Sequence, residues 1–268
     1  MGEILPERDP ATHVERKVWE FAMLALFLEQ TGRMGEDTQA LAVGAGDERI
    51  VFWLANRLGR MVATDIYGEG DFAGREAAPS MLEDPPAHAP FPYREDRLEV
   101  RWMDARRLDF PDESFDVVFS LSSFEHFGGP GDVAAAASEM GRVLRPGGHA
   151  FVVTECFVRR HPLNAAPADL AVRLLTLGQK RRRAGLRRRA VVVEVFTPGE
   201  LQRLIVEPSG LELMQPLDLT LPAASRVNVT RTDESGLHPA SGDYWPHVLL
   251  QADRSLFTSV ALPLRKPL

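Results

Sequence analysis

The sequence LAVGAGDERIVFWLANRLGRMVATD, Leu41 to Asp65, predicts a strand, a glycine turn, a helix and a second strand. Leu41–Val43 is a short apolar run, and Gly44-Ala45-Gly46 can adopt backbone angles closed to larger residues. Apolar residues then recur at helical spacing from Ile50 to Leu58, and Met61–Thr64 is strand-like. Two parallel strands joined by a crossover helix result, so the glycine turn and the end of the second strand face one crevice.

Asp65 stands at the end of the second strand, where a carboxylate can accept two hydrogen bonds from a ribose diol. The stretch therefore predicts a nucleoside site. It does not identify the nucleoside, because the third glycine of the dinucleotide pattern G-x-G-x-x-G is Arg49 here.

Length and composition indicate an ordinary globular protein. The chain has 268 residues, 44% hydrophobic and 26% charged, which suits one large α/β domain with room for an insertion. The single Cys156 excludes an internal disulfide, and the formal net charge of −7 gives no global attraction to nucleic acid. We find neither a membrane-length apolar stretch nor a basic signal region, so we expect a cytoplasmic location.

Residues 13–30 form an amphipathic helical pattern ahead of the quoted stretch. We expect this helix to pack over the sheet or in a dimer contact, with a lid over the bound nucleoside as the alternative. The sequence thus predicts an N-terminal helical segment, residues 1–35, followed by an α/β domain, residues 36–268.

Two further strands are predicted to end in polar residues. Leu98 to Met103 alternates in strand fashion and ends at Asp104-Ala105, which would place Asp104 across the crevice from Asp65. There its carboxylate could accept a hydrogen bond from an exocyclic amine. The alternative is that Asp104 only caps a loop. Phe115 to Leu121 is predicted to be a buried central strand.

The order of these motifs resembles the class I S-adenosylmethionine-dependent methyltransferases, in particular methyltransferase type 11. The resemblance covers about Gln39 to Glu155, and its most specific parts are FPDESFDVVFS and EMGRVLRPGGHAFVV. It implies a Rossmann-like α/β fold with a seven-stranded, mostly parallel sheet, the last strand antiparallel, and helices on both faces. It also implies S-adenosyl-L-methionine as the cofactor, lying across the carboxyl ends of strands one, two and three.

The family resemblance also implies the cofactor contacts. The glycine turn would run under the methionine and ribose, Asp65 would hold the ribose hydroxyls, and the following residues would contact the adenine or line the methionine end. The implied cofactor residues are Gly44, Ala45, Gly46, Asp65, Ile66, Asp104, Ala105, Ser120, Leu121 and Ser122. The chain departs from the family at Ala42, where an acidic residue is usual, and at Glu48, where a third glycine is usual.

Methyl transfer from a sulfonium is an in-line displacement that depends on positioning and, for oxygen acceptors, on removal of a proton. His126 and Glu125, directly after the central strand, are the candidate catalytic bases. The alternative for both is a packing or hydrogen-bonding role in that loop. No metal ligands are predicted.

The second half carries two insertions. A basic helical insertion near residues 165–190 contains the run 180–189, in which seven of ten residues are basic; it is a solvated helix end or a contact for an anionic surface. A polar insertion near residues 220–250 carries Tyr244 and Trp245, which could stack on a sugar or anchor the loop. A nucleic-acid substrate is not expected, because SLSSF at 120–124 lacks the Asn/Asp-Pro-Pro-aromatic motif of base-modifying relatives.

The sequence therefore predicts a methyltransferase that acts on a small-molecule or glycan-type acceptor. Two alternatives stay open. One is a non-catalytic module that keeps the fold for partner contacts. The other is an NAD-dependent oxidoreductase, against which Arg49 and the absence of a Tyr-x-x-x-Lys pair argue.

Overall fold

The structure is a computed structural model that describes residues 1–7, 14–70, 72–159, 195–221, 223–227, 229–233, 236–238, 248–252 and 255–268. The predicted basic insertion, with its run 180–189, lies outside these residues, as do Tyr244 and Trp245. Within the described ranges, no helix combines the length and the apolar character needed to cross a membrane.

The stretch from Leu41 to Asp65 folds as its sequence predicts. It forms β1 (Gln39–Val43), α2 (Arg49–Ala55) and β2 (Arg60–Asp65), and β1 pairs in parallel with β2 from Gln39 opposite Arg60. Gly44 and Gly46 have φ values of +68° and +50°, in the left-handed region where glycine is favoured. The turn thus depends on the two glycines that the sequence places there.

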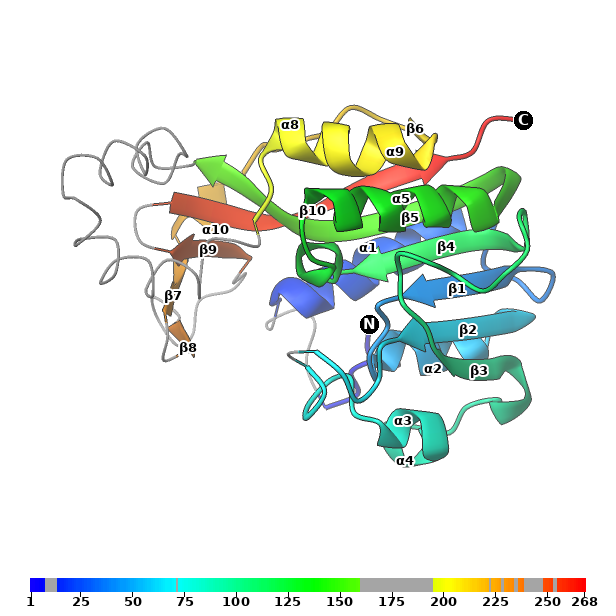
Figure 1. Ribbon diagram of the computed structural model, residues 1–268. Helices are drawn as coiled ribbons and strands as arrows, with labels where there is room; N and C mark the ends of the chain where they lie inside the picture. Colours follow the sequence, from blue (N-terminus) through cyan, green and yellow to red (C-terminus); the bar gives the residue numbers. More distant parts are fainter. Residues whose placement is uncertain are drawn as a thin grey trace.

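The expected seven strands form one sheet (Figure 1). Five parallel strands make its first part, in the order β3 (Leu98–Trp102), β2, β1, β4 (Phe115–Leu121) and β5 (Leu144–Arg159). The long strand β10 (Ser255–Arg265) then pairs antiparallel with β5 and, on its other edge, with β6 (Glu212–Leu213). The prediction of a mostly parallel sheet with an antiparallel end is confirmed.

The polar insertion adds to this sheet, which the sequence did not predict. Beyond β10 lie β9 (Leu249–Ala252), β7 (Val229–Asp233) and β8 (Gly236–His238), while α10 (Ala223–Val227) precedes them. In the described part of the chain the sheet therefore has ten strands. The extension forms because β10 has an edge with which β9 can pair, and β9 in turn pairs with β7. Strand formation depends on such pairing more than on local propensity.

Helices cover both faces of the sheet, as predicted (Figure 1). One face packs against α1 (Arg16–Gln30) and α2, and the other against α5 (Pro130–Val143) and a helix built from α8 (Pro198–Leu201), η4 (Gln202–Val206) and α9 (Glu207–Ser209). Short turns α3 (Ser80–Glu83), α4 (Pro85–His88), η1 (Glu95–Arg97) and η2 (Phe124–His126) lie in the connections. Because α1 shares its apolar core with β1, β2 and β4, it covers the sheet directly.

Glycine residues lie at a close contact between two helices and at a bulge in β5. Gly141 of α5 lies so close to α9 that a Cβ atom there would stand 1.9 Å from the Ser209 carbonyl oxygen. In the segment RPGG, Leu144 pairs with Phe115 and His149 already pairs with Val117, so residues 145–148 bulge out of the ladder. Strand β5 therefore begins at Leu144, ahead of this bulge.

Candidate active site

A cavity of about 630 Å³ lies at the carboxyl ends of the parallel strands, within the usual size range of small-molecule sites. It brings together nearly all of the residues predicted for cofactor and catalysis. The predicted residues that line it are Gly44, Ala45, Gly46, Asp65, Ile66, Asp104, Ala105, Leu121, Ser122, Glu125 and His126. The structure places Ser120 elsewhere: it is buried within β4 and is not among the lining residues.

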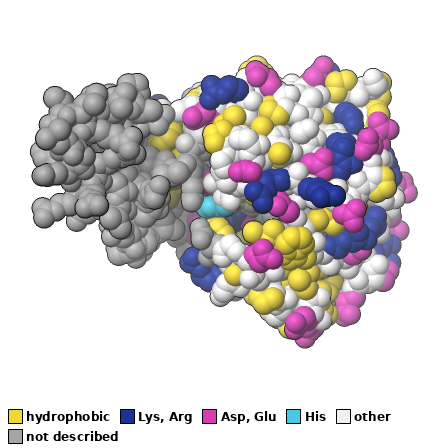
Figure 2. Space-filling model, viewed as in Figure 1, with side chains coloured by type: hydrophobic (Ala, Val, Ile, Leu, Met, Phe, Trp, Pro, Cys, Tyr) yellow, Lys and Arg dark blue, Asp and Glu magenta, His cyan; other side chains and the backbone are white. Residues whose placement is uncertain are grey.

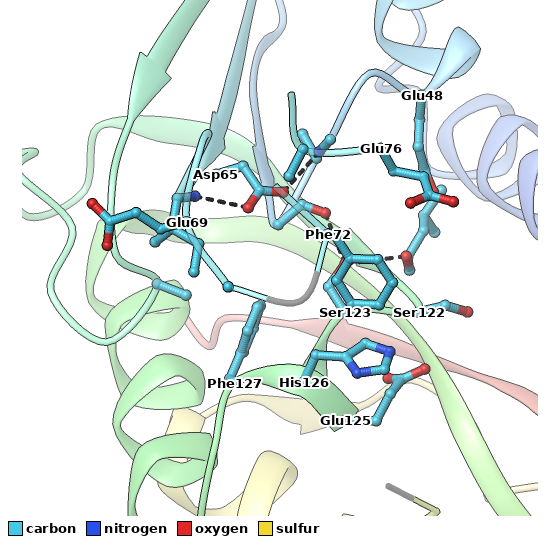
Figure 3. Close-up of a pocket in the computed structure, with 18 of the residues that line it drawn as sticks. Glu48, Asp65, Glu69, Phe72, Glu76, Ser122, Ser123, Glu125, His126 and Phe127 are labelled. Carbon is cyan, nitrogen blue, oxygen red and sulfur yellow. Dashed lines mark hydrogen bonds between the residues drawn. The ribbon is translucent and has the colours of Figure 1, made fainter. Parts of the chain in front are cut away.

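Asp65 is held at the end of β2 by two backbone amides (Figure 3). Its carboxylate accepts from Gly46 N at 2.9 Å and from Ile66 N at 2.7 Å, and burial raises its pKa despite these two bonds. The Tyr67 hydroxyl donates to the Gly46 carbonyl at 2.8 Å, which fixes the glycine turn against β2. Each carboxylate oxygen still has a lone pair for a ligand hydroxyl, as a ribose diol requires.

The end of β4 is tied to the same glycine turn. The Ser123 hydroxyl donates to the Gly44 carbonyl at 2.7 Å, and Ser122 has a φ of +52°, an uncommon conformation for a residue with a side chain. The Ser122 hydroxyl donates to Glu20 of α1 at 2.7 Å. Such local strain persists where surrounding contacts hold it, and it gathers at binding sites.

Asp104 lies on the same cavity as Asp65, as the sequence predicts, but its carboxylate is already bonded. The Arg106 guanidinium donates to it at 2.6 Å and the Arg106 amide at 2.9 Å, and the side-chain bond holds the pKa of Asp104 below its usual value. A contact of this carboxylate with an adenine amine thus stays a prediction that would have to share the group with Arg106.

Glu125 and His126 stand together at the other end of the cavity (Figure 3). Glu125 is 7% exposed, and burial, reinforced by neighbouring Glu155, raises its pKa to about 7. The Thr154 hydroxyl donates to its carboxylate. The His126 ring meets Phe72 edge to face, with ring centroids 4.7 Å apart. The arrangement leaves both the packing and the proton-accepting role open to His126.

The sequence did not predict several charged residues of the cavity wall, among them Arg16, Lys17 and Glu155. Arg16 of α1 forms an ion pair with Glu155 of β5, and Lys17 of α1 forms one with Glu48. The sequence shows Arg16 and Lys17 at the start of the amphipathic helix. It does not show their acidic partners, because those residues are far away in the sequence. Helix α1 therefore forms part of the cavity wall.

Acidic and basic side chains are interspersed on the described surface that Figure 2 shows. That face has no continuous basic area of the kind that binds a phosphate backbone. In the described ranges, no group of three or more His, Cys, Asp or Glu side chains is placed to hold a metal ion.

Comparison with known proteins agrees with this geometry. The family model of the methyltransferase domain, methyltransferase type 11, matches residues 41–152. Phosphatidylethanolamine N-methyltransferase of Cereibacter sphaeroides is 42% identical over 80 residues, which is 30% of this chain and 38% of that relative. Methyltransferase GfsG of Streptomyces halstedii is 24% identical over 220 residues, 81% of this chain and 74% of the relative.

The fold has counterparts among solved structures. The crystal structure of a SAM-dependent methyltransferase from Methanosarcina mazei matches with a TM-score of 0.50 and 16% identity, covering 90% of this chain and 98% of that one. The sheet order, the cavity at its carboxyl edge and the matched domain lead to one assignment. Residues 41–152 form a methyltransferase domain of type 11, within a fold shared with S-adenosylmethionine-dependent methyltransferases.

Proposed function

We propose that this protein transfers a methyl group from S-adenosylmethionine to a small-molecule acceptor. One observation carries the proposal: a single cavity joins Asp65, a carboxylate suited to a ribose diol, to the polar pair Glu125 and His126. A nucleoside bound at the first end would have its 5′ side directed past the glycine turn. The second end is then available to an acceptor.

The residues of the first end fit the adenosine part of the cofactor. Asp65 would accept from the ribose hydroxyls, and Ile66 offers an apolar contact to a purine ring beside it. Ala105 and Asp104 lie on the β3 side of the same end. The two left-handed glycines keep the turn free of side chains, so that a ligand can approach its backbone.

The residues of the second end would orient the acceptor and receive its proton. Bound S-adenosylmethionine would supply a methyl group on a sulfonium, and attack of an aligned nucleophile on that carbon would release the neutral thioether S-adenosylhomocysteine. Glu125 has a pKa near neutrality, so its carboxylate can take a proton from an acceptor hydroxyl or amine at physiological pH. His126 next to it, or His126 in its place, can do the same.

A small acceptor fits the relatives better than a polymer. The relative from Cereibacter sphaeroides is a phosphatidylethanolamine N-methyltransferase, whose acceptor is an amine on a lipid head group. This chain matches only 38% of that relative's length, so the acceptor of this chain is a proposal of chemical class only. A glycan-type acceptor is the second prediction, and it rests on the polar insertion near residues 220–250, whose Tyr244 and Trp245 lie outside the described residues.

Two experiments test the proposal. Calorimetry should show binding of S-adenosylmethionine and no heat with NADH; heat with NADH alone would support an oxidoreductase, and no heat with either would support the non-catalytic module. Cell extract incubated with the protein and the methyl-labelled cofactor should then yield a small labelled compound, identified by mass spectrometry. Label confined to polysaccharide would support the glycan acceptor instead.

A further inference from the structure

Helix α1 places a positive charge among oxygen atoms at the junction of β1 and β4. The Lys17 ammonium contacts the Glu48 carboxylate, donates to the Leu121 carbonyl at 3.2 Å and lies 3.0 Å from Glu20 Oε2. Burial lowers the pKa of Lys17, but the carboxylates of Glu48 and Glu20 more than offset this, so its pKa lies above the usual value. Lys17 therefore stays charged and fixed on the cavity wall.

Glu48 is the carboxylate that the glycine turn presents to the cavity. It precedes α2 at the N-cap position, yet its side chain makes no capping hydrogen bond and contacts Lys17 through Oε1. Its second oxygen can accept from another donor. Position 42, by contrast, holds a buried alanine of the apolar core, so β1 itself brings no acid to this end.

The two charges stand close to the group that would anchor the ribose. Glu48 follows Gly46 by two residues, and the Gly46 amide donates to Asp65 at 2.9 Å. Lys17 is tied to Leu121 at the end of β4, the strand next to β1. The second α1 ion pair, Arg16 with Glu155, lies on β5 beside Glu125 instead, toward the acceptor end.

Burial raises the pKa of Glu48 to about 7, although the neighbouring Lys17 ammonium opposes this rise. A second ammonium at the free oxygen would favour the charged carboxylate further, so the pair is complementary to an amino acid, which carries an ammonium and a carboxylate. We propose that Lys17 and Glu48 bind the zwitterionic amino acid end of the cofactor, with Lys17 toward its carboxylate and Glu48 toward its ammonium. The inference rests on the proposed function, since it presumes a nucleoside anchored at Asp65. In this chain the pair would take the place of the acidic side chain absent at position 42.

Binding measurements on the full chain test the pair without relying on turnover. S-adenosylhomocysteine carries the amino acid end, whereas 5′-methylthioadenosine has the same nucleoside without it. For Lys17→Met and for Glu48→Gln, calorimetry should show a loss of about 10- to 100-fold for S-adenosylhomocysteine, the range of one charged hydrogen bond. Affinity for 5′-methylthioadenosine should change less than about twofold. Glu29→Gln, an exposed site near the far end of α1, is the matched control and should change neither.

A ligand change separates a binding role from a structural one. The wild type should prefer S-adenosylhomocysteine over its decarboxylated analogue, Lys17→Met should lose that preference, and Lys17→Arg should keep most of it. An equal loss for all three nucleosides in the variants, or a preference unchanged in Lys17→Met, overturns the proposal. Failure of the wild type to bind any of the nucleosides instead refutes the proposed function.

Discussion

Replacing Gly44 with alanine should destabilise the protein by about 2 kcal/mol, because two separate costs meet at this position. Its φ of +68° costs a residue with a Cβ about 1 kcal/mol. That Cβ would also stand 2.6 Å from Ser123 Cβ, which must move and so weakens the 2.7 Å bond from Ser123 Oγ to the Gly44 carbonyl. A net hydrogen bond contributes about 1 kcal/mol.

Thermal or urea unfolding measures this effect. For a chain of this size, about 2 kcal/mol corresponds to a Tm lower by about 4 to 8 °C. The matched control is Gly131→Ala on α5, since Gly131 has nothing within 4 Å of a built Cβ and an ordinary φ. Its stability should change by less than about 0.5 kcal/mol.

A double-mutant cycle identifies the contact responsible. Ser123→Gly removes the two nearest atoms that a Cβ at Gly44 would meet and leaves Phe127 Cε1 at 3.1 Å. The double variant should therefore be more stable, by about 1 kcal/mol, than the sum of the two single effects implies. Strict additivity, or a Gly44→Ala variant as stable as the wild type, would refute the reasoning from the contact between turn and strand end.

Asp65→Ala should weaken S-adenosylhomocysteine binding by about 100-fold, since two hydrogen bonds to a carboxylate are lost; an unchanged Kd by calorimetry would contradict the diol contact. Burial raises the pKa of Glu125 from 4.5 to about 7, so the folded state keeps a proton that the unfolded chain releases. Stability should consequently fall as pH rises from 4.5 to about 7, and urea titrations should show that Glu125→Gln removes this fall. If Glu125 is the base, kcat/KM for the acceptor should rise with pH and level off above about 7 in the wild type, and Glu125→Gln should abolish that rise; a profile shared by both proteins would assign the proton elsewhere. Gly141→Ala should cost about 3 kcal/mol in urea unfolding, because its Cβ would meet a backbone oxygen of α9; wild-type stability would disprove that close packing.

The local elements of the fold could be predicted from sequence because each has a short-range signal. The turn between β1 and α2 needs residues that adopt left-handed backbone angles, and Gly44 and Gly46 supply them. The central strand β4 runs from Phe115 to Leu121, as its apolar run predicts. These features depend on residues within a few positions of one another.

The parts that could not be predicted depend on distant partners. Glu20 lies on α1, a helix that was predicted from its apolar residues, and a carboxylate on such a helix is expected to face solvent. Instead it is fully buried and accepts hydrogen bonds from Ser122 and Ser259. The strands β7, β8 and β9 formed in a segment read as a polar loop, because β10 offered an edge to pair with. Neither outcome has a local signature.

The hydrogen bond from Ser259 to Glu20 spans 239 residues and has a consequence for biosynthesis. A ribosome adding ~5–20 residues per second needs roughly 10 to 50 seconds to travel that distance. During that interval the nascent helix α1 carries a carboxylate whose burial site does not yet exist. The burial of Glu20 can therefore be completed only late in translation, whereas Glu48 and Leu121, which hold Lys17, are made well before β10.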